Sequence, residues 1–291
     1  MLKDLDTFTK NIKGKIRLNY NLKNHTWLNI GGNAKIFFVP ETLAELREFL
    51  VYLKKNNNDF FLLGAGSNLL ISENIQNRIF IKLGKNFNKI SLMNDNIVIA
   101  GCSILDKNVS DFATNNNLSG LEFLSCIPGS VGGGIRMNSG CFGKEFKDVL
   151  LSVQVMDYDG KVYTIDSKNI NFEYRKISLP KNLIFLSASF KTFKKDRKEI
   201  EDTINKFKQK KENSQPLRVK TGGSTFKNPK AQTKKKVWEL IRESVDIKTN
   251  FGDAKISDKH SNFFINSKNA SFENMYNLIN FVKNKVKDKT G

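Results

Sequence analysis

The sequence predicts an α+β protein of two domains, and three observations along the chain lead to this fold class. A strand, helix, strand unit occupies residues 36–63, and a region rich in strands occupies residues 149–191. A charged stretch of helical character, Lys195–Glu212, then leads into a shorter part that mixes helices and strands again. Because the composition changes at this stretch, we expect it to link two domains.

The first unit begins with Ile36–Val39, a short apolar run that predicts a strand. Pro40-Glu41 is expected to open a helix that ends at Asn56-Asn57-Asn58. Apolar residues recur between these limits at helical spacing, namely Leu43, Leu46, Phe49, Leu50 and Leu53. Phe60–Leu63 predicts a buried strand, and Gly64 follows it directly. The unit therefore delivers a glycine-rich loop to the edge of a sheet.

The middle of the chain predicts further strands around one helix. Strands are expected at Ile79–Leu83, Ile97–Ala100 and Leu183–Lys191, and Asp159-Gly160 predicts a tight turn between the strands Val149–Tyr158 and Lys161–Ile165. A helix is expected at residues 104–117, with one apolar face made of Leu105, Val109, Phe112 and Ala113.

The last part predicts a helix, a strand and a final helix. These elements are expected at about Lys234–Ser244, at Asn262–Asn266, and after Ser271, which is a favourable N-cap residue. The final helix carries an apolar stripe of Phe272, Met275, Leu278, Ile279, Val282 and Val286. A stripe of this kind ordinarily faces a core, so we assign it no chemistry.

Composition excludes several classes of protein. The 291 residues include 23 Phe and lack an apolar stretch of the roughly 20 residues that span a bilayer, and the first residues do not form a secretory signal. We therefore expect a soluble protein of the cytosol. Three cysteines and two histidines show no ligand spacing, so no metal site is expected. The net charge of +19 comes from lysines scattered along the whole chain, which makes nucleic-acid binding the less favoured interpretation.

The first segment with a candidate functional role is Gly64-Ala65-Gly66-Ser67-Asn68-Leu69-Leu70. It follows a strand, and its glycines permit a close approach of backbone N–H groups to a diphosphate. It lacks the third glycine of the dinucleotide-binding fingerprint, and no helical pattern follows it. Taken alone, the loop is equally compatible with a plain strand connection.

The second segment, Ile127–Gly140, belongs to the stretch Gly120–Gly143, which contains seven glycines in 24 residues. Each glycine weakens a helix or strand by roughly 0.5 to 1 kcal/mol relative to alanine, so we interpret the stretch as backbone packed against a flat ligand. Ser130 and Asn138 are then candidates for polar contacts to a heterocycle, and Ile127 and Val131 for contacts to its apolar face.

The third segment is Thr221–Pro229, in which Gly222-Gly223 precedes Ser224. The glycines leave the hydroxyl exposed, and Lys227 and Asn228 are close enough in sequence to bind an anion. No nucleophile elbow is present, so a proton-donating serine fits better than a hydrolase triad. A plain Gly-Gly-Ser turn is the structural alternative.

These segments, in this order, closely resemble the UDP-N-acetylenolpyruvoylglucosamine reductase family. Further motifs that carry the resemblance are Thr26-Trp27-Leu28-Asn29-Ile30-Gly31-Gly32 and Phe172-Glu173-Tyr174-Arg175. The sequence has one Tyr-Arg segment and then continues to Gln215-Pro216 without an extra insertion that covers the substrate. In this it is similar to the family's shorter, second type.

The resemblance implies a fold in two parts. Residues 1–195 are expected to form an FAD-binding domain of the vanillyl-alcohol oxidase (PCMH) type, with lobes at about 1–83 and 84–195. Residues 196–291 are expected to form an α+β substrate domain. The implied FAD-binding residues are Gly64, Ala65, Gly66, Ser67, Asn68, Leu69, Ile127, Pro128, Gly129, Ser130, Gly132, Gly133, Asn138 and Gly140.

The resemblance also implies a reaction, in which NADPH reduces non-covalent FAD and the reduced flavin then reduces UDP-N-acetylglucosamine enolpyruvate to UDP-N-acetylmuramate. Arg175 is the implied stabiliser of the enolate, and Ser224 the implied proton donor to the α-carbon. The implied substrate-binding residues are Tyr174, Lys210, Lys211, Lys227 and Asn228, and the sequence does not decide between the two adjacent lysines. The expected partners are small molecules, and a monomer is expected.

One departure from the family leaves an alternative open. A glutamate that assists protonation lies after the family's final helix, whereas this sequence stops at Lys289-Thr290-Gly291. We therefore keep the alternative that the chain binds FAD with impaired or no turnover. An oxidase of the same architecture is a further alternative, which Ser224 disfavours.

Overall fold

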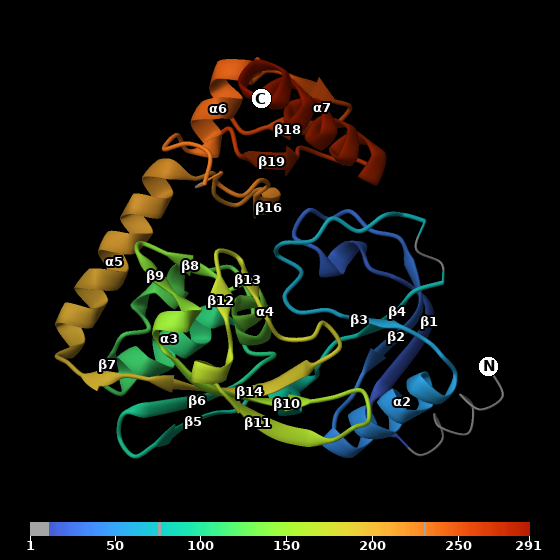
Figure 1. Ribbon diagram of the computed structural model, residues 1–291, viewed down its shortest axis with the longest axis vertical. Coiled ribbons are helices and arrows are strands. Elements are labelled where there is room, and N and C mark those ends of the chain that lie inside the picture. Colours follow the sequence, from blue (N-terminus) through green and yellow to red (C-terminus); the bar gives the residue numbers. More distant parts are fainter. Residues whose placement is uncertain (1–11, 75–76, 230) are drawn as a thin grey trace. The chain divides into compact units, whose positions relative to one another are not determined.

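The computed structural model describes residues 12–74, 77–229 and 231–291, and its contacts divide the chain into two compact units (Figure 1). The first unit contains residues 1–20, 34–65 and 77–209, and the second contains residues 21–33, 66–76 and 210–291. Two segments from the N-terminal third of the chain therefore pack with the C-terminal part. Our division by sequence placed those segments, 21–33 and 66–76, in the first domain.

The first lobe of the first unit is a four-stranded sheet with the order β1-β2-β4-β3 and one covering helix, α2. The elements are β1 (Lys15–Asn21), β2 (Asn33–Val39), α2 (Leu43–Lys55), β3 (Phe60–Leu62) and β4 (Ile79–Ile81). Strands β2 and β3 both run parallel to β4, which lies between them. The predicted strand, helix, strand unit is therefore confirmed.

Helix α2 begins at a capping box between Thr42 and Glu45, so it starts two residues later than Pro40-Glu41 implied. Its core face is made of Leu46, Phe49, Leu50 and Leu53, all fully buried. Leu43 was predicted on this face but is 43% exposed, because it is the first helical residue, at the end of the helix.

The second lobe is an antiparallel sheet with the order β11-β10-β14-β6-β5. Its strands are β5 (Ile90–Met93), β6 (Ile97–Gly101), β10 (Leu150–Met156), β11 (Val162–Asp166) and β14 (Ile184–Lys191). The turn between β10 and β11 uses a positive φ only at Gly160. Met156, Ile184 and Leu186 of this sheet pack with the core under α2, so the two lobes share apolar contacts.

Helices α3 (Asp106–Asn115) and α4 (Val131–Arg136) pack on the larger core of this unit. Leu105 was predicted on the buried face of α3, but it is the N-cap residue and is 47% exposed. Helix α4 lies inside the glycine-rich segment and was not predicted, because three successive glycines carry little helix propensity. Its two apolar side chains, Val131 and Ile135, are fully buried, so tertiary packing forms this helix.

Short elements complete the first unit. They are η2 (Lys85–Phe87), β7 (Leu118–Ser119), η3 (Glu122–Cys126), β8 (Gly140–Cys141), β9 (Lys144–Glu145), η4 (Phe146–Asp148), η5 (Ser167–Asn169), β12 (Phe172–Glu173), β13 (Lys176–Ile177) and β15 (Phe193–Lys194). A further short helix, η1 (Lys23–His25), belongs to the second unit. The predicted charged helix is confirmed as α5 (Arg197–Ser214), and the boundary between the units falls within it.

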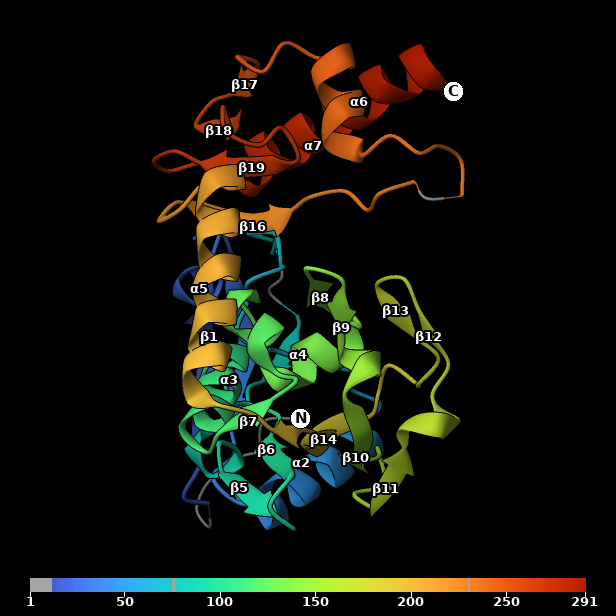
Figure 2. The same ribbon diagram turned by 90° about the vertical axis from the view of Figure 1, so that its left-hand side faces the viewer.

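The second unit contains a four-stranded sheet with the order β16-β19-β18-β17 and two helices (Figure 2). Its elements are β16 (Lys220–Ser224), α6 (Val237–Ser244), β17 (Asn250–Phe251), β18 (Ala254–Ile256), β19 (Phe263–Asn266) and α7 (Phe272–Thr290). Ser271 caps α7, and Met275, Leu278 and Val282 are buried in a core with Leu28 and Ile30. The predicted core stripe of the last helix is confirmed.

The described residues contain neither a candidate membrane-spanning helix nor a candidate metal site. None of the helices there is long and apolar enough to cross a membrane. In the same part of the chain, no group of three or more His, Cys, Asp or Glu side chains is placed to hold a metal ion. The three cysteines are free thiols.

Candidate active site

The loop that follows β3 is shared between the two units. Gly64 and Ala65 belong to the first unit, and Gly66, Ser67, Asn68 and Leu69 belong to the second. Gly66 has a φ of +70°, and an added Cβ would overlap the carbonyl oxygen of His25. Its own carbonyl accepts a hydrogen bond of 3.0 Å from the N–H of Trp27. Packing within the second unit therefore explains why residue 66 is a glycine.

The two predicted glycine-rich segments meet in the first unit, at Gly64 and Ser130. A Cβ added to Gly64 would lie 2.7 Å from the Ser130 hydroxyl oxygen, so a larger residue there would require the Ser130 hydroxyl to move. Ser130 is 3% exposed, and it is the N-cap residue of α4. The ammonium of Lys82 lies at the same place and donates a hydrogen bond of 2.6 Å to the carbonyl of Gly64.

Glycine is required in Ile127–Gly140 for reasons that differ from one position to the next. An added Cβ would overlap the ring of Phe146 at Gly134 and the backbone of Lys144 at Gly140, and it would lie 3.1 Å from the carbonyl oxygen of Cys102 at Gly132. At Gly133 it would meet only the Ser130 hydroxyl, at 3.5 Å. Our interpretation that a flat ligand explains the glycines of this segment is therefore wrong for Gly134 and Gly140, where the protein itself fills the space.

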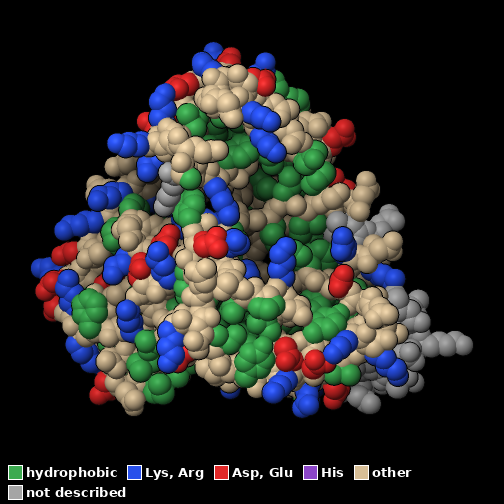
Figure 3. All heavy atoms as spheres, in the orientation of Figure 1, with side chains coloured by type: hydrophobic (Ala, Val, Ile, Leu, Met, Phe, Trp, Pro, Cys, Tyr) green, Lys and Arg blue, Asp and Glu red, His purple; other side chains and the backbone are tan. Residues whose placement is uncertain are grey.

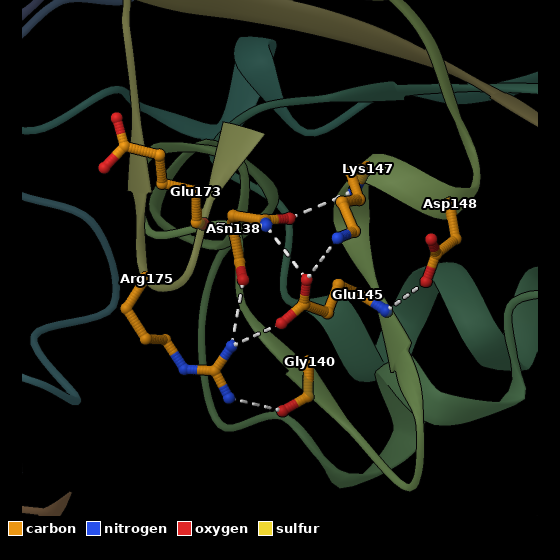
Figure 4. A network of polar contacts seen from close by, with 7 residues as sticks. All are labelled: Asn138, Gly140, Glu145, Lys147, Asp148, Glu173 and Arg175. Atoms are coloured by element: carbon orange, nitrogen blue, oxygen red, sulfur yellow. Dashed lines mark hydrogen bonds and ion pairs between the residues drawn. The ribbon is translucent and has the colours of Figure 1, made fainter. Parts of the chain in front are cut away.

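Two side chains predicted to touch a ligand are used inside the protein. Val131 is fully buried in the core, so it does not cover the face of a heterocycle. Asn138 is also fully buried, with a φ of +40°. Its amide donates to Glu145 Oε2 and to the carbonyl of Glu173, each at 3.1 Å, and accepts from the N–H of Lys147 (Figure 4). The Asn138 side chain therefore fixes the segment, and its backbone N–H also bonds within the protein, to the carbonyl of Ile135 at 3.0 Å.

Arg175 lies at the turn between β12 and β13, where its φ is +58°. Its guanidinium donates to the carbonyls of Asn138 and Gly140, each at 3.0 Å, and to Glu145 Oε1 at 3.3 Å (Figure 4). It also lies over the ring of Tyr174, 5.0 Å from the centroid. The structure therefore brings three predicted residues, Asn138, Gly140 and Arg175, into one network whose central carboxylate is Glu145.

Ser224 lies at the end of β16, after a break in the pairing with β19. Thr221 pairs with Ile265 and Ser224 with Phe263, so one extra residue is accommodated on β16. Gly223 has a φ of +78° and open space where a Cβ would stand. Such a bulge re-aims the following side chain, and Ser224 is exposed. The predicted exposure of the serine after two glycines is therefore confirmed.

The loop after Ser224 is held by Asn262, which is 3% exposed. Its side-chain oxygen accepts from the N–H of Phe226 at 2.9 Å, and its amide nitrogen donates to the carbonyl of Phe226 at 3.0 Å. Its backbone carbonyl accepts from the N–H of Thr225 at 2.8 Å. One buried amide therefore replaces the strand pairing that the bulge interrupts.

The remaining candidates also lie in the second unit. Lys227 is exposed, and Asn228 accepts a hydrogen bond of 2.9 Å from the N–H of Val237 at the start of α6. Lys210 and Lys211 lie in the last turns of α5, with Lys210 exposed and Lys211 half-buried.

Asp106 is a buried carboxyl group beside the glycine-rich segment. Its N–H donates to the carbonyl of Gly129 at 3.0 Å, and a Cβ on Gly129 would lie 2.9 Å from its carboxyl oxygen. Among the described residues, neither carboxyl oxygen has a hydrogen-bond partner. Burial raises the pKa of Asp106 well above its usual value, and the pKa of the buried Cys102 thiol is raised by burial and by Asp106.

Sequence reasoning missed Lys82, Glu145 and Asn262. None of them lies in a glycine-rich segment, and each acts through a contact with a residue far away in the chain. The one signal available was a charged or amide residue next to a strand, which is too common to select them.

Comparison with known families shows what the chain is similar to. The model of the FAD binding domain matches residues 34–166, which include Gly64 and the whole segment Ile127–Gly140. The model of the UDP-N-acetylenolpyruvoylglucosamine reductase C-terminal domain matches residues 215–291, which include Ser224.

Relatives match over nearly the whole chain. The UDP-N-acetylenolpyruvoylglucosamine reductase of Pelagibacter ubique is 51% identical over 292 residues, covering 100% of this chain and 96% of that protein. The crystal structure of the reductase from Thermus caldophilus has a TM-score of 0.81 at 30% identity, covering 94% of this chain and 95% of that one.

A more distant likeness concerns the fold alone. A variant of Phl p 4, a glucose oxidase, has a TM-score of 0.50 at 10% identity, covering 66% of this chain and 44% of that one. Together with the two matched domains, these findings confirm the predicted fold class, a flavoprotein FAD-binding domain followed by a C-terminal α+β domain.

Proposed function

Since the chain belongs to the UDP-N-acetylenolpyruvoylglucosamine reductase family, an FAD-dependent oxidoreductase family, we propose that it reduces UDP-N-acetylglucosamine enolpyruvate to UDP-N-acetylmuramate with NADPH. This reaction would serve the synthesis of peptidoglycan precursors. The observation that carries the proposal is the fixed guanidinium of Arg175, held by carbonyls of the same glycine-rich segment that is assigned to the flavin.

The residues present fit FAD in two places. At Gly64 and at Gly133 an added Cβ would meet only the Ser130 side chain, so no other side chain obstructs an approach to the backbone on that side. Gly64–Leu69 would hold the diphosphate, and Ile127–Gly140 the isoalloxazine ring. Bound FAD supplies hydride transfer, first from NADPH and then to the β-carbon of the enolpyruvyl group.

Arg175 would stabilise the negative charge that develops on the substrate carboxylate and α-carbon. Its charge is permanent, and its planar fork matches a carboxylate. Three acceptors already fix the guanidinium, which makes it a preorganised electrostatic group that needs little rearrangement during the reaction. The Glu145 carboxylate oxygen Oε1 lies 3.3 Å from the guanidinium nitrogen of Arg175 and offsets part of its positive charge. It therefore moderates the stabilisation that Arg175 would give to the negative charge on the substrate.

Ser224 would donate a proton to the α-carbon after hydride has reached the β-carbon. A hydroxyl is a weak acid, so its usefulness depends on being held within hydrogen-bond reach of the carbanion-like carbon. The bulge at Gly222-Gly223 and the clamp of Asn262 on Phe226 hold the serine in a defined direction. Tyr174, Lys210 or Lys211, Lys227 and Asn228 are the candidates for binding the rest of the sugar nucleotide.

We further expect a cytosolic monomer that acts on small molecules. On the question of a nucleic-acid partner, Lys and Arg side chains are spread over the face seen in Figure 3 with Asp and Glu among them, rather than gathered into one stripe. Nucleic-acid binding is therefore not part of the proposal.

The test is the oxidation of NADPH by the purified, yellow protein. We expect continued oxidation of NADPH, beyond the one equivalent that reduces the bound flavin, to require the enolpyruvyl substrate and to yield one UDP-N-acetylmuramate for each NADPH consumed. Flavin reduction by NADPH without reoxidation by that substrate would favour the alternative, an FAD-binding protein with impaired or no turnover.

A further inference from the structure

Lys82 is a cation beneath the loop assigned to the flavin diphosphate, and the proposed mechanism gives it no role. It follows β4 directly, and its side chain lies half-buried against the end of β3. Its ammonium donates a hydrogen bond of 2.6 Å to the carbonyl of Gly64. One hydrogen bond leaves two further N–H donors on the ammonium.

No carboxylate of the described residues lies within ion-pair distance of this ammonium, although the same residues contain eight ion pairs. Burial alone lowers the pKa of Lys82, without an acidic neighbour to raise it. A desolvated charge is unfavourable unless an opposite charge compensates it. The residues that the structure describes do not supply that charge, and an anionic ligand beside Gly64 would supply it.

The location of Lys82 favours an anionic ligand. Strands β2, β3 and β4 are parallel, and both Gly64 and Lys82 follow the carboxyl ends of their strands. Ligands of sheets with parallel strands bind outside this edge. Ser130, from the second glycine-rich segment, lies at the same point because it limits the space at Gly64.

The cations that lie within the two segments themselves are accounted for. Gly64–Leu69 contains no Lys or Arg, and Ile127–Gly140 contains only Arg136. The guanidinium of Arg136 donates to the carbonyls of Leu179, Pro180 and Leu183, and it lies 4.3 Å from the ring centroid of Phe185. Arg136 therefore serves the fold of the first unit, and Lys82 is left as the cation beside Gly64.

We propose that Lys82 is a cofactor-binding residue that forms an ion pair with a phosphate of the FAD diphosphate. The proposal rests on the assignment of the Gly64 loop to that diphosphate. Lysine is suited to this task, because its ammonium acts as a compact point charge with several donors for phosphate oxygens. The bond to Gly64 fixes the ammonium before the cofactor arrives, so little side-chain entropy is lost on binding.

The test compares three variants of the full chain after removal of the flavin. Lys82→Met keeps the length of the side chain and removes its charge, whereas Lys82→Arg retains the charge. Lys85→Met is the matched control, because it removes the same charge from an exposed lysine three residues away. Three quantities are measured: the dissociation constant of FAD by calorimetry, the thermal midpoint of the flavin-free protein, and the midpoint potential of the bound flavin.

We expect Lys82→Met to weaken FAD binding about 30-fold or more, as is typical when one partner of a buried charge pair is removed. Lys82→Arg should retain most of the affinity, and Lys85→Met should retain all of it. The thermal midpoint of the flavin-free Lys82→Met protein should not fall, because the variant loses a desolvated charge. The flavin potential should stay unchanged, because the diphosphate is remote from the redox-active ring.

Three results would overturn the proposal. Equal FAD affinity of Lys82→Met and wild type would show that the ammonium has no phosphate partner. A lower flavin potential in Lys82→Met would place the cation at the isoalloxazine ring instead. A loss of affinity matched by a lower thermal midpoint of the flavin-free protein would indicate a structural role. If the wild-type protein itself failed to bind FAD, the cofactor assignment would be wrong, and the variants would not be needed to show it.

Discussion

The glycine-rich segment Ile127–Gly140 and the serine loop Thr221–Asn228 both depend on glycine, for different reasons. In the first, neighbouring atoms occupy the space at Gly132, Gly134 and Gly140, so small size is what the fold requires. In the second, Gly223 has open space and a φ of +78°, so backbone conformation is what it requires. The comparison shows that a run of glycines is not by itself evidence of a ligand, and that each position has to be tested for what fills it.

The largest expected effect concerns the serine loop. Ser224→Ala removes the proposed proton donor and leaves the flavin segments intact, so reduction of the flavin by NADPH should proceed as in wild type. Turnover of the enolpyruvyl substrate should fall roughly 10²-fold to 10⁴-fold, the usual contribution of a general acid. Stopped-flow measurement of the two half-reactions checks this. Equal loss of both half-reactions would assign the serine another role.

The next largest effect is expected in the glycine-rich segment, where two neighbouring substitutions form a matched pair. Gly134→Ala forces a methyl group into the Phe146 ring and should destabilise the flavin-free protein by about 1 to 3 kcal/mol. Gly133→Ala meets only ordinary contact with Ser130 and should not destabilise it, because alanine favours the helix. Urea unfolding measures both.

The same pair separates packing from ligand contact. FAD affinity should fall in Gly133→Ala although its flavin-free form is stable, since Gly133 is one of the residues proposed to contact the cofactor and an added methyl group meets no protein atom other than the Ser130 hydroxyl oxygen. If both alanine variants were equally stable and bound FAD equally well, the distinction drawn between the two glycines would be incorrect.

A smaller effect is expected at the clamp on the serine loop. Asn262→Ala removes both side-chain hydrogen bonds to Phe226 and should lower kcat about tenfold while KM changes little. Ser261→Ala is the control, because its hydroxyl is equally buried but bonds the carbonyl of Trp238 in α6 instead. Steady-state kinetics of both variants measure this. An equal fall in the kcat of Ser261→Ala would show that the hydrogen bonds from Asn262 to Phe226 have no special role.

The smallest effect concerns pH and the carboxyl group beside the glycine-rich segment. Burial raises the pKa of Asp106 in the folded protein, so the folded state retains a proton that the unfolded chain loses above about pH 4. Stability should therefore fall as pH rises through this window, up to the folded pKa. Asp106→Asn removes the ionisable group, and its free energy of unfolding relative to wild type should increase as the pH rises above about 4.

The control for this prediction is Asp111→Asn, which changes an exposed carboxylate on the same helix. It should show no such trend relative to wild type. A flat difference between Asp106→Asn and wild type across this range would mean that Asp106 is ionised and compensated in the folded protein.

Much of the fold could be predicted because local patterns and tertiary packing agree. The periodic residues of α2 are buried as predicted, apart from Leu43 at the first turn. On the predicted stripe of α7, Met275, Leu278 and Val282 are buried, whereas Phe272, Ile279 and Val286 are half-buried against the same core. Helix α4 could not be predicted, because its glycines oppose helix formation and only the contacts of Val131 and Ile135 stabilise it. The assignment of segments 21–33 and 66–76 to the second unit was equally inaccessible, because it depends on long-range contacts such as that of Gly66 with His25.

The candidate site was predictable where the chemistry lies in a local motif. Ser224 after Gly222-Gly223 is exposed as predicted, and Arg175 joins the glycine-rich segment. The predicted contacts of Val131 and of the Asn138 side chain to a ligand were not supported, because both are buried and used within the first unit. Partners such as Glu145 and Asn262 become visible only when segments distant in sequence come together.

The most direct test of the central claim is an anaerobic single turnover with the wild-type protein. NADPH is added in an amount equal to the bound flavin, its oxidation is followed to completion, and the enolpyruvyl substrate is then mixed in. If Arg175 and Ser224 act as proposed, the flavin absorbance returns fully and UDP-N-acetylmuramate is recovered in equal amount. A flavin that stays reduced in the presence of this substrate would contradict the account.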